Sequence, residues 1–233
     1  QILNQAAKFR YMFGGKAVTP LVIRTMVGAG LRAAAQHSQM LTSLWTHIPG
    51  LKVVCPSTGA DAKGLLKSAI RCDDPVVFLE HKLLYAKKEQ IPDGEYLIPL
   101  GKADVKRPGK DLTILTWSRQ VYFSLEAAET LAAQGIDAEV VDLRTLVPLD
   151  WEAIRASVQK TGNVMVVEEG VRRGGVGAEL AAEIQEELFD DLDAPVARVA
   201  GANIVPPFSP PLEDVMFPHP ADIVAAAHKL LAK

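Results

Sequence analysis

The chain has 233 residues, of which 48% are hydrophobic and 23% are charged. This composition is typical of a globular protein of one large or two ordinary domains and excludes a disordered chain. The formal net charge of −3 gives no electrostatic basis for binding nucleic acid or an anionic membrane. No apolar run approaches the length of a membrane span, and no Cys/His spacing is typical of a metal site.

The first residues of the chain differ from the usual N-terminus of a complete protein. Residue 1 is Gln and not Met, and residues 1–13 begin inside a helical pattern with no capping residue in front of it. This start predicts that the chain is the later part of a longer protein. Residues 21–23 then form an apolar run typical of a buried parallel strand.

A glycine-rich loop with one histidine follows that strand. Residues 28–39 read Gly-Ala-Gly-Leu-Arg-Ala-Ala-Ala-Gln-His-Ser-Gln. Such a loop presents a titratable group at the carboxyl end of a strand, and we expect His37 at the start of a helix. Taken alone, a histidine beside a serine is also typical of hydrogen bonding at a helix start. The pattern by itself therefore leaves catalysis and capping open, with Ser38 as the expected cap.

The rest of the first half predicts a strand–helix–strand unit. Residues 52–54 and 75–79 are apolar strand runs, and residues 61–70 place apolar side chains at helical spacing between them. Ser57 or Thr58 is the expected cap of that helix. Because the two strands are parallel, the crossover between them should be right-handed.

Prolines and charges gather between residues 84 and 111, which predicts a linker. Alternation of strands and helices then resumes, and Asp150 is the expected cap of its second helix. This alternation predicts a second parallel sheet covered on both faces. Strands are expected at residues 112–116, 138–141, 164–167 and 196–200, and helices at 121–133, 150–160, 176–188 and 222–231.

Short stretches across nearly the whole chain resemble one family. The clearest are Ala-Ala-Gln-His-Ser-Gln at 34–39 and Val-Val-Asp-Leu-Arg-Thr-Leu-Val-Pro-Leu-Asp at 140–150. They resemble the β subunit of the E1 component of thiamin-diphosphate-dependent 2-oxo acid dehydrogenases, and are most similar to its pyruvate and acetoin branches. The other stretches, in the same order as in that family, are 47–54, 61–71, 75–80, 98–103, 167–169 and 175–179.

The resemblance implies an α/β fold of two doubly wound, mostly parallel sheet domains. Residues 1–90 would be the remainder of a transketolase-type pyrimidine-binding domain, 91–110 a linker and 111–233 a transketolase-type C-terminal domain. The implied enzyme is an oxidoreductase that is active only with an α subunit. It decarboxylates pyruvate or a related 2-oxo acid, or cleaves acetoin, and transfers the acyl group to lipoyl groups.

His37 matches the active-site histidine of that family, facing the substrate and the incoming lipoyl group. Thiamin diphosphate with Mg²⁺ would be shared with the α subunit, because this chain has no Gly-Asp-Gly diphosphate motif. The other cofactor contacts, including the activating glutamate, are expected upstream of Gln1 and on the α subunit. A potassium ion is expected mainly on main-chain oxygens, although the family often has Asp at position 72 and Asn at position 74. The implied potassium ligands are Leu21, Ala69, Cys72 and Asp74.

The implied partners are an α subunit in an α2β2 assembly, a second β subunit and a lipoyl acyltransferase (E2) core. Two cysteines are too few for a disulfide framework, which with the family predicts the bacterial cytoplasm or the mitochondrial matrix. The substrate stays open among pyruvate, acetoin and branched-chain 2-oxo acids. A non-catalytic dimerisation or docking fragment is the alternative, and a stand-alone transketolase-like enzyme is disfavoured.

Three further features carry expectations of their own. His81 ends a predicted strand, where it either approaches a site or lies at a solvated edge. Glu168 and Glu169 precede a glycine-rich turn, and we expect a structural or interface role for them. Residues 204–211 are rich in proline and are expected to form an ordered surface strap anchored by Phe208.

Overall fold

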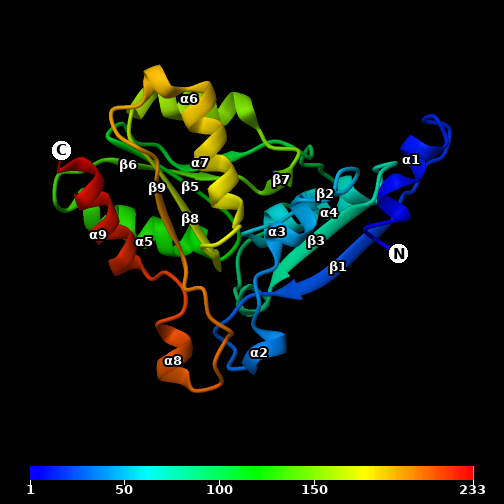
Figure 1. Cartoon of the computed structure of the whole chain (residues 1–233), viewed down its shortest axis with the longest axis horizontal. Helices are drawn as coiled ribbons and strands as arrows, with labels where there is room; N and C mark the ends of the chain where they lie inside the picture. The colour runs from blue at the N-terminus through cyan, green and yellow to red at the C-terminus, as the bar shows by residue number, and fades with distance from the viewer. Residues whose placement is uncertain (233) are drawn as a thin grey trace.

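The computed structural model describes residues 1–232 as two β-sheets with helices packed around them (Figure 1). The sheets lie side by side, and the two ends of the chain lie at opposite ends of the molecule. An α/β fold with two mostly parallel sheets is therefore confirmed.

The first sheet has the strand order β1-β3-β2-β7. Strands β1 (Val22–Val27), β3 (Val76–His81) and β2 (Lys52–Val54) are parallel, as the apolar runs predict. Helix α4 (Gly59–Ile70) connects β2 to β3. The fourth strand, β7 (Thr145–Val147), comes from the second half of the chain and pairs antiparallel with β2.

The second sheet has the order β4-β6-β5-β8-β9. All neighbouring pairs are parallel except β4 with β6. Its strands are β4 (Asp104–Arg107), β5 (Leu112–Thr116), β6 (Ala138–Asp142), β8 (Val164–Val171) and β9 (Ala197–Gly201).

Helices cover both faces of the second sheet, as its near-continuous apolar strands require. Helices α5 (Gln120–Ala132) and α9 (Pro220–Leu231) lie on one face, and α6 (Trp151–Thr161) and α7 (Val176–Glu187) lie on the other (Figure 1). A doubly covered sheet is therefore what the alternating sequence pattern produces.

The helix ends follow the expected capping chemistry. The Thr58 hydroxyl accepts the Asp61 N–H at the start of α4, and the Asp150 carboxylate accepts the Ala153 N–H at the start of α6. Helix α6 ends at Gly162, whose φ of 62° suits glycine. The remaining elements are short: η1 (Ala6–Lys8), α1 (Phe9–Met12), α2 (Ala34–His37), α3 (Thr42–Thr46), η2 (Lys82–Leu84), η3 (Phe189–Asp191) and α8 (Pro210–Asp214).

One apolar core joins the two halves. Val53 and Leu79 of the first sheet pack in the same cluster as Leu115 and Val141 of the second. Part of the expected linker, 91–110, is strand β4, so that segment belongs partly to the second sheet. The division at 1–90, 91–110 and 111–233 stays a prediction. Among the described residues, no helix is long and apolar enough to cross a membrane.

Candidate functional site

The glycine-rich loop leaves β1 at its carboxyl end and turns sharply. Gly28 and Gly30 have φ angles of 93° and 95°, which side chains rarely adopt. A Cβ on Gly28 would lie 2.2 Å from Nε2 of His81. Glycine at this position therefore allows the loop backbone to rest directly on the His81 ring.

His37 lies at the end of this loop with its side chain exposed. It is the last residue of the four-residue helix α2, so the expectation that it begins a helix was wrong. The expected capping role of Ser38 was also wrong, because its buried hydroxyl has no hydrogen-bond partner within residues 1–232. Nε2 of Gln39 donates to the Ala35 carbonyl (3.0 Å) and closes the short helix.

A buried histidine–glutamate pair lies beneath the loop. His81 Nε2 is 2.8 Å from Glu169 Oε2, and both side chains are shielded from solvent. The Leu83 N–H donates to His81 Nδ1 (3.2 Å), so that nitrogen carries no proton. The ring is therefore the neutral Nε2–H tautomer, which donates to an ionised Glu169.

The Ala29 N–H supplies a second hydrogen bond to Glu169, at 2.7 Å from Oε1. Burial favours the neutral acid, but the hydrogen bonds from His81 and Ala29 outweigh it and hold the pKa of Glu169 below its usual value. Of the two readings of His81, the structure excludes the solvated edge. His81 joins the first sheet to the second through Glu169, which follows the apolar residues of β8.

The four residues expected to bind potassium gather at one place, where the α4–β3 turn meets the start of β1. The Asp74 carboxylate there is paired with Arg10 (2.5 Å) and Lys52 (3.4 Å). A cation at this turn would therefore depend on carbonyl oxygens. Leu21 lies just before β1, Ala69 lies in the last turn of α4, and Cys72 and Asp74 lie in the turn itself.

A cavity of about 260 Å³ opens beside the histidine loop. Its lining includes Ser38 and Glu169 together with the apolar side chains of Ile204, Val205 and Met216. The expected anchoring by Phe208 was wrong, because 70% of that side chain is exposed. The segment meets the cavity through Ile204 and Val205 instead.

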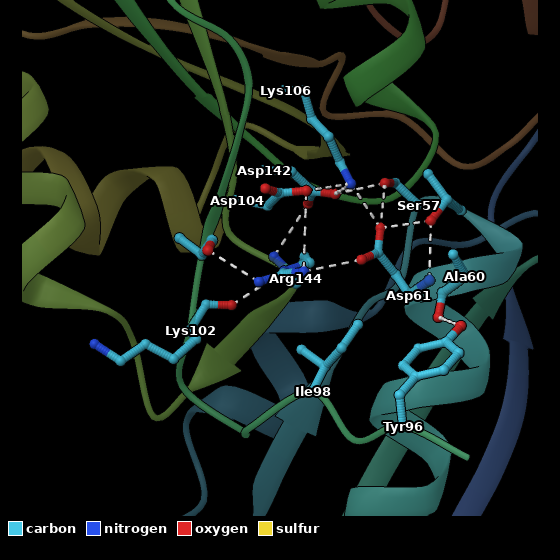
Figure 2. A network of polar contacts seen from close by, with 12 residues as sticks. Ser57, Ala60, Asp61, Tyr96, Ile98, Lys102, Asp104, Lys106, Asp142 and Arg144 are labelled. Atoms are coloured by element: carbon cyan, nitrogen blue, oxygen red, sulfur yellow. Dashed lines mark hydrogen bonds and ion pairs between the residues drawn. The ribbon is translucent and has the colours of Figure 1, made fainter. Parts of the chain in front are cut away.

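A second polar network joins α4 of the first half to β4 and β6 of the second half (Figure 2). Asp61, in the first turn of α4, accepts from Lys106 of β4 (2.7 Å) and from Arg144 (2.9 Å). The Ser57 hydroxyl donates to Asp142 (2.5 Å), the last residue of β6. Burial raises the pKa of Asp142 to about 7.

Known protein families match both halves of the chain. Residues 2–88 match the transketolase pyrimidine-binding domain, and residues 101–223 match the transketolase C-terminal domain. A solved structure titled "Split gene transketolase, inactive beta4 tetramer" superposes with a TM-score of 0.76 at 26% identity, covering 97% of this chain and 74% of that one.

Characterised relatives are more similar still. The acetoin:2,6-dichlorophenolindophenol oxidoreductase subunit beta of Cupriavidus necator is 56% identical over 99% of this chain and 68% of its own length. The chain belongs to the E1 β-subunit family. The pyruvate dehydrogenase E1 component subunit beta of Porphyra purpurea is 50% identical over 99% of this chain and 70% of its own. The 2-oxoisovalerate dehydrogenase subunit beta of Bacillus subtilis is 46% identical over 99% and 71%.

Several groups around the loop of this E1 β chain could not be assigned to it from the sequence. Glu169 lies in the family-like stretch 167–169 but was expected to have a structural or interface role, and Glu213 and Arg119 lie in segments with no recognisable motif. Arg119 approaches the Ala29 carbonyl (3.5 Å) and stacks on Phe123 and Phe217. The Ala-Ala-Gln-His-Ser-Gln motif identifies His37 from the sequence, but only the folded structure brings these charged groups to its loop.

Glu168, in β8, is another buried carboxyl, and its side chain accepts a hydrogen bond from the N-terminus of helix α7. Burial raises its pKa from 4.5 to about 7, although the Gly177 N–H (3.1 Å) and Arg198 (4.0 Å) favour its charged form. Because the folded state holds this proton more tightly than the unfolded state, the free energy of unfolding should fall as pH rises from about 4.5 to about 7.

We expect Glu168→Gln to remove this part of the pH dependence, which amounts to about 1 kcal/mol per pH unit. Urea unfolding at pH 5 and pH 8 measures it in the variant and the parent. Asp142 titrates in both proteins, so the difference between them isolates Glu168. Exposed Glu126, changed to Gln, should keep the parent's dependence. An unchanged pH dependence in Glu168→Gln would contradict the prediction.

Proposed function

We propose that this chain is the β subunit of a thiamin-diphosphate-dependent E1 component that oxidatively decarboxylates a 2-oxo acid or cleaves acetoin. It acts with an α subunit in an α2β2 assembly and passes the acyl group to lipoyl groups of an E2 core. The observation that carries the proposal is the exposed imidazole of His37, on a loop held at the edge where the two sheets meet. The relatives' substrates keep pyruvate, acetoin and branched-chain 2-oxo acids as candidates.

The residues around the loop fit the organic part of the cofactor better than its metal. An imidazole, the unpartnered hydroxyl of Ser38 and an apolar cavity wall lie together there. Residues 1–232 contain no cluster of three or more His, Cys, Asp or Glu side chains suited to a metal ion. We therefore assign Mg²⁺ and the diphosphate to the α subunit. Bound thiamin diphosphate supplies the carbanion stabilisation that the reaction needs.

Side chains of this chain have two tasks: His37 transfers protons, and the buried pair of His81 and Glu169 holds the loop that carries it. His37 is exposed to solvent, so its ring nitrogens are available to donate a proton to, or accept one from, a group that arrives from outside. The ionised Glu169 and neutral His81 stay buried beneath the loop and hold its backbone. In this assignment His37 is the catalytic residue, and the buried pair maintains the surface on which it lies.

We extend the proposal to potassium, partners and location. A potassium ion at the α4–β3 turn would take carbonyl oxygens of Leu21, Ala69 and Cys72, since the Asp74 carboxylate is paired with cations. A second β subunit completes the assembly. The bacterial and mitochondrial relatives support the cytoplasm of a bacterium or the mitochondrial matrix.

His37→Ala in the assembled complex tests the proposal. We expect acyl transfer to lipoamide to fall by at least about 100-fold, the lower range for losing a positioned acid or base. His47→Ala is the matched control, because His47 is also exposed but lies outside the loop. Far-UV circular dichroism should show the same fold in both variants.

Full activity in His37→Ala would contradict the catalytic assignment. Native mass spectrometry of the protein from its source cells then separates the alternatives. An assembly with an α partner that retains thiamin diphosphate supports the dehydrogenase. A homodimer of this chain without cofactor would favour the dimerisation or docking module.

A further inference from the structure

The histidine loop is held by acidic side chains from the other half of the chain. Glu213 belongs to α8, which lies beside α2 along the lower edge of the molecule in Figure 1. Its carboxylate is fully buried and accepts the Gly30 N–H (3.1 Å) and an Arg32 N–H (2.7 Å). The next residue, Asp214, accepts a second N–H from Arg32 (2.8 Å). The loop and α8 are thus joined by charged hydrogen bonds across 181 positions of sequence.

The loop needs such restraint because its backbone is strained. Arg32 and Ala34 both have φ angles of 59°, although neither is glycine. A non-glycine residue in this left-handed region is strained, because its Cβ lies too close to the carbonyl oxygen that follows it. Two such residues lie within five positions of His37, so the loop would relax to other conformations without contacts that hold it.

Glu213 acts at Arg32, the first of these two strained residues. Glu169 holds the Ala29 N–H at the base of the loop, but Arg32 and the residues that follow it lie beyond that contact. Only α8 reaches Arg32 among the contacts of the described chain. Because Glu213 binds both Gly30 and Arg32, one buried carboxylate fixes the turn on each side of Leu31.

We propose that Glu213 is a positioning residue for His37. Its carboxylate holds residues 30–32 in the strained turn, and that turn sets where α2 presents the imidazole. The inference rests on the proposed function of His37. Hydrogen bonds to a charged group are stronger than those between neutral groups, and Glu213 accepts two of them across this turn.

Hydrogen exchange and steady-state kinetics of the assembled enzyme together test the proposal. In Glu213→Gln, which keeps the shape and removes the charge, we expect amides of residues 28–37 to exchange about 10-fold faster, corresponding to about 1.4 kcal/mol. The same variant should lower kcat about 10-fold and change KM less. Exposed Glu126→Gln should leave both measurements unchanged.

Changes at Arg32 provide an independent check that does not alter the buried carboxylate. Arg32→Ala removes the ion pairs but keeps the strain, whereas Arg32→Gly removes both. We expect faster loop exchange in both variants, and a larger increase in Arg32→Ala, where the strain is unopposed. Equal loop exchange in Arg32→Ala and the parent would overturn the proposal.

The remaining outcomes are distinct. If amide exchange in the loop is unchanged in Glu213→Gln, the inference is overturned whatever the activity. If exchange rises by the same factor in β5 and β8 as in the loop, the variant is generally destabilised, and the inference is overturned as well. Faster loop exchange with parental kcat shows that the restraint does not position His37, which also overturns it. Full activity in His37→Ala is a separate result and refutes the proposed function, since the exchange measurement does not depend on catalysis.

Discussion

Replacing the neutral His81 ring with leucine is expected to lower the free energy of unfolding by about 1.5–3 kcal/mol, the range for losing a hydrogen bond to a charged group. The change leaves the Glu169 carboxylate, 2% exposed, with the Ala29 N–H as its remaining hydrogen-bond donor. Desolvation of a carboxylate is costly unless it is paired. The loop backbone that rests on the His81 ring also loses its support at Gly28.

Urea unfolding at several pH values gives the measurement and its internal check. The destabilisation of His81→Leu should be larger at pH 8 than at pH 5, because Glu169 without its partner can take up a proton at low pH. The double variant His81→Leu/Glu169→Leu should recover part of the loss, since no buried charge remains. His228→Gln, which alters an exposed histidine on α9, should change stability by less than about 0.5 kcal/mol. A double variant less stable than the sum of the single changes would contradict the pairing.

The repeated apolar runs made most of the fold predictable. Strand β5 occupies the predicted residues, and α4, α5, α6 and α7 lie within a few residues of their predicted limits. Caps such as Thr58 and Asp150 have a local chemical signature, so they too could be predicted. These elements depend mainly on neighbours in sequence.

Strands β4 and β7 were missed for a physical reason. Each is short, and each is stabilised by antiparallel pairing with a strand far along the chain. Lys106, in β4, looks like part of a charged linker until its partners in α4 are known. Helix α8 is similar, because its Pro-Pro-Leu-Glu-Asp sequence acquires a role only through Arg32.

In the candidate site, too, some features could be predicted from local sequence and others depend on contacts between distant residues. His37 lies in a motif that can be recognised from sequence, and the structure places it on an exposed loop. Its helix position could not be predicted, because the left-handed conformations of Arg32 and Ala34 depend on contacts with Glu213 and Asp214. Glu169 and His81 are 88 positions apart, and no local pattern predicts that they meet.

Replacing Asp61 with alanine, in the network of Figure 2, is expected to lower the free energy of unfolding by about 3 kcal/mol. Asp61 is 3% exposed, and its carboxylate binds Lys106 and Arg144, whose side chains are 15% and 11% exposed. Hydrogen bonds from Lys106 and Thr58 overcome burial and keep the pKa of Asp61 below its usual value. Removing the carboxylate leaves two partly buried cations with too little compensating charge.

Urea unfolding at low and high salt distinguishes this network from a surface ion pair. Because the pairs are shielded from solvent, the loss in Asp61→Ala should persist at 1 M salt, where exposed pairs are screened. Asp61→Asn should cost less, since the amide oxygen can still accept a hydrogen bond while the charge is lost. Asp93→Ala is the matched control, because Asp93 lies exposed before β4 and should change stability by less than about 0.5 kcal/mol. If Asp61→Ala were no less stable than this control, the network would not be what joins α4 to the second sheet, and the shared apolar core would have to hold the two halves together by itself.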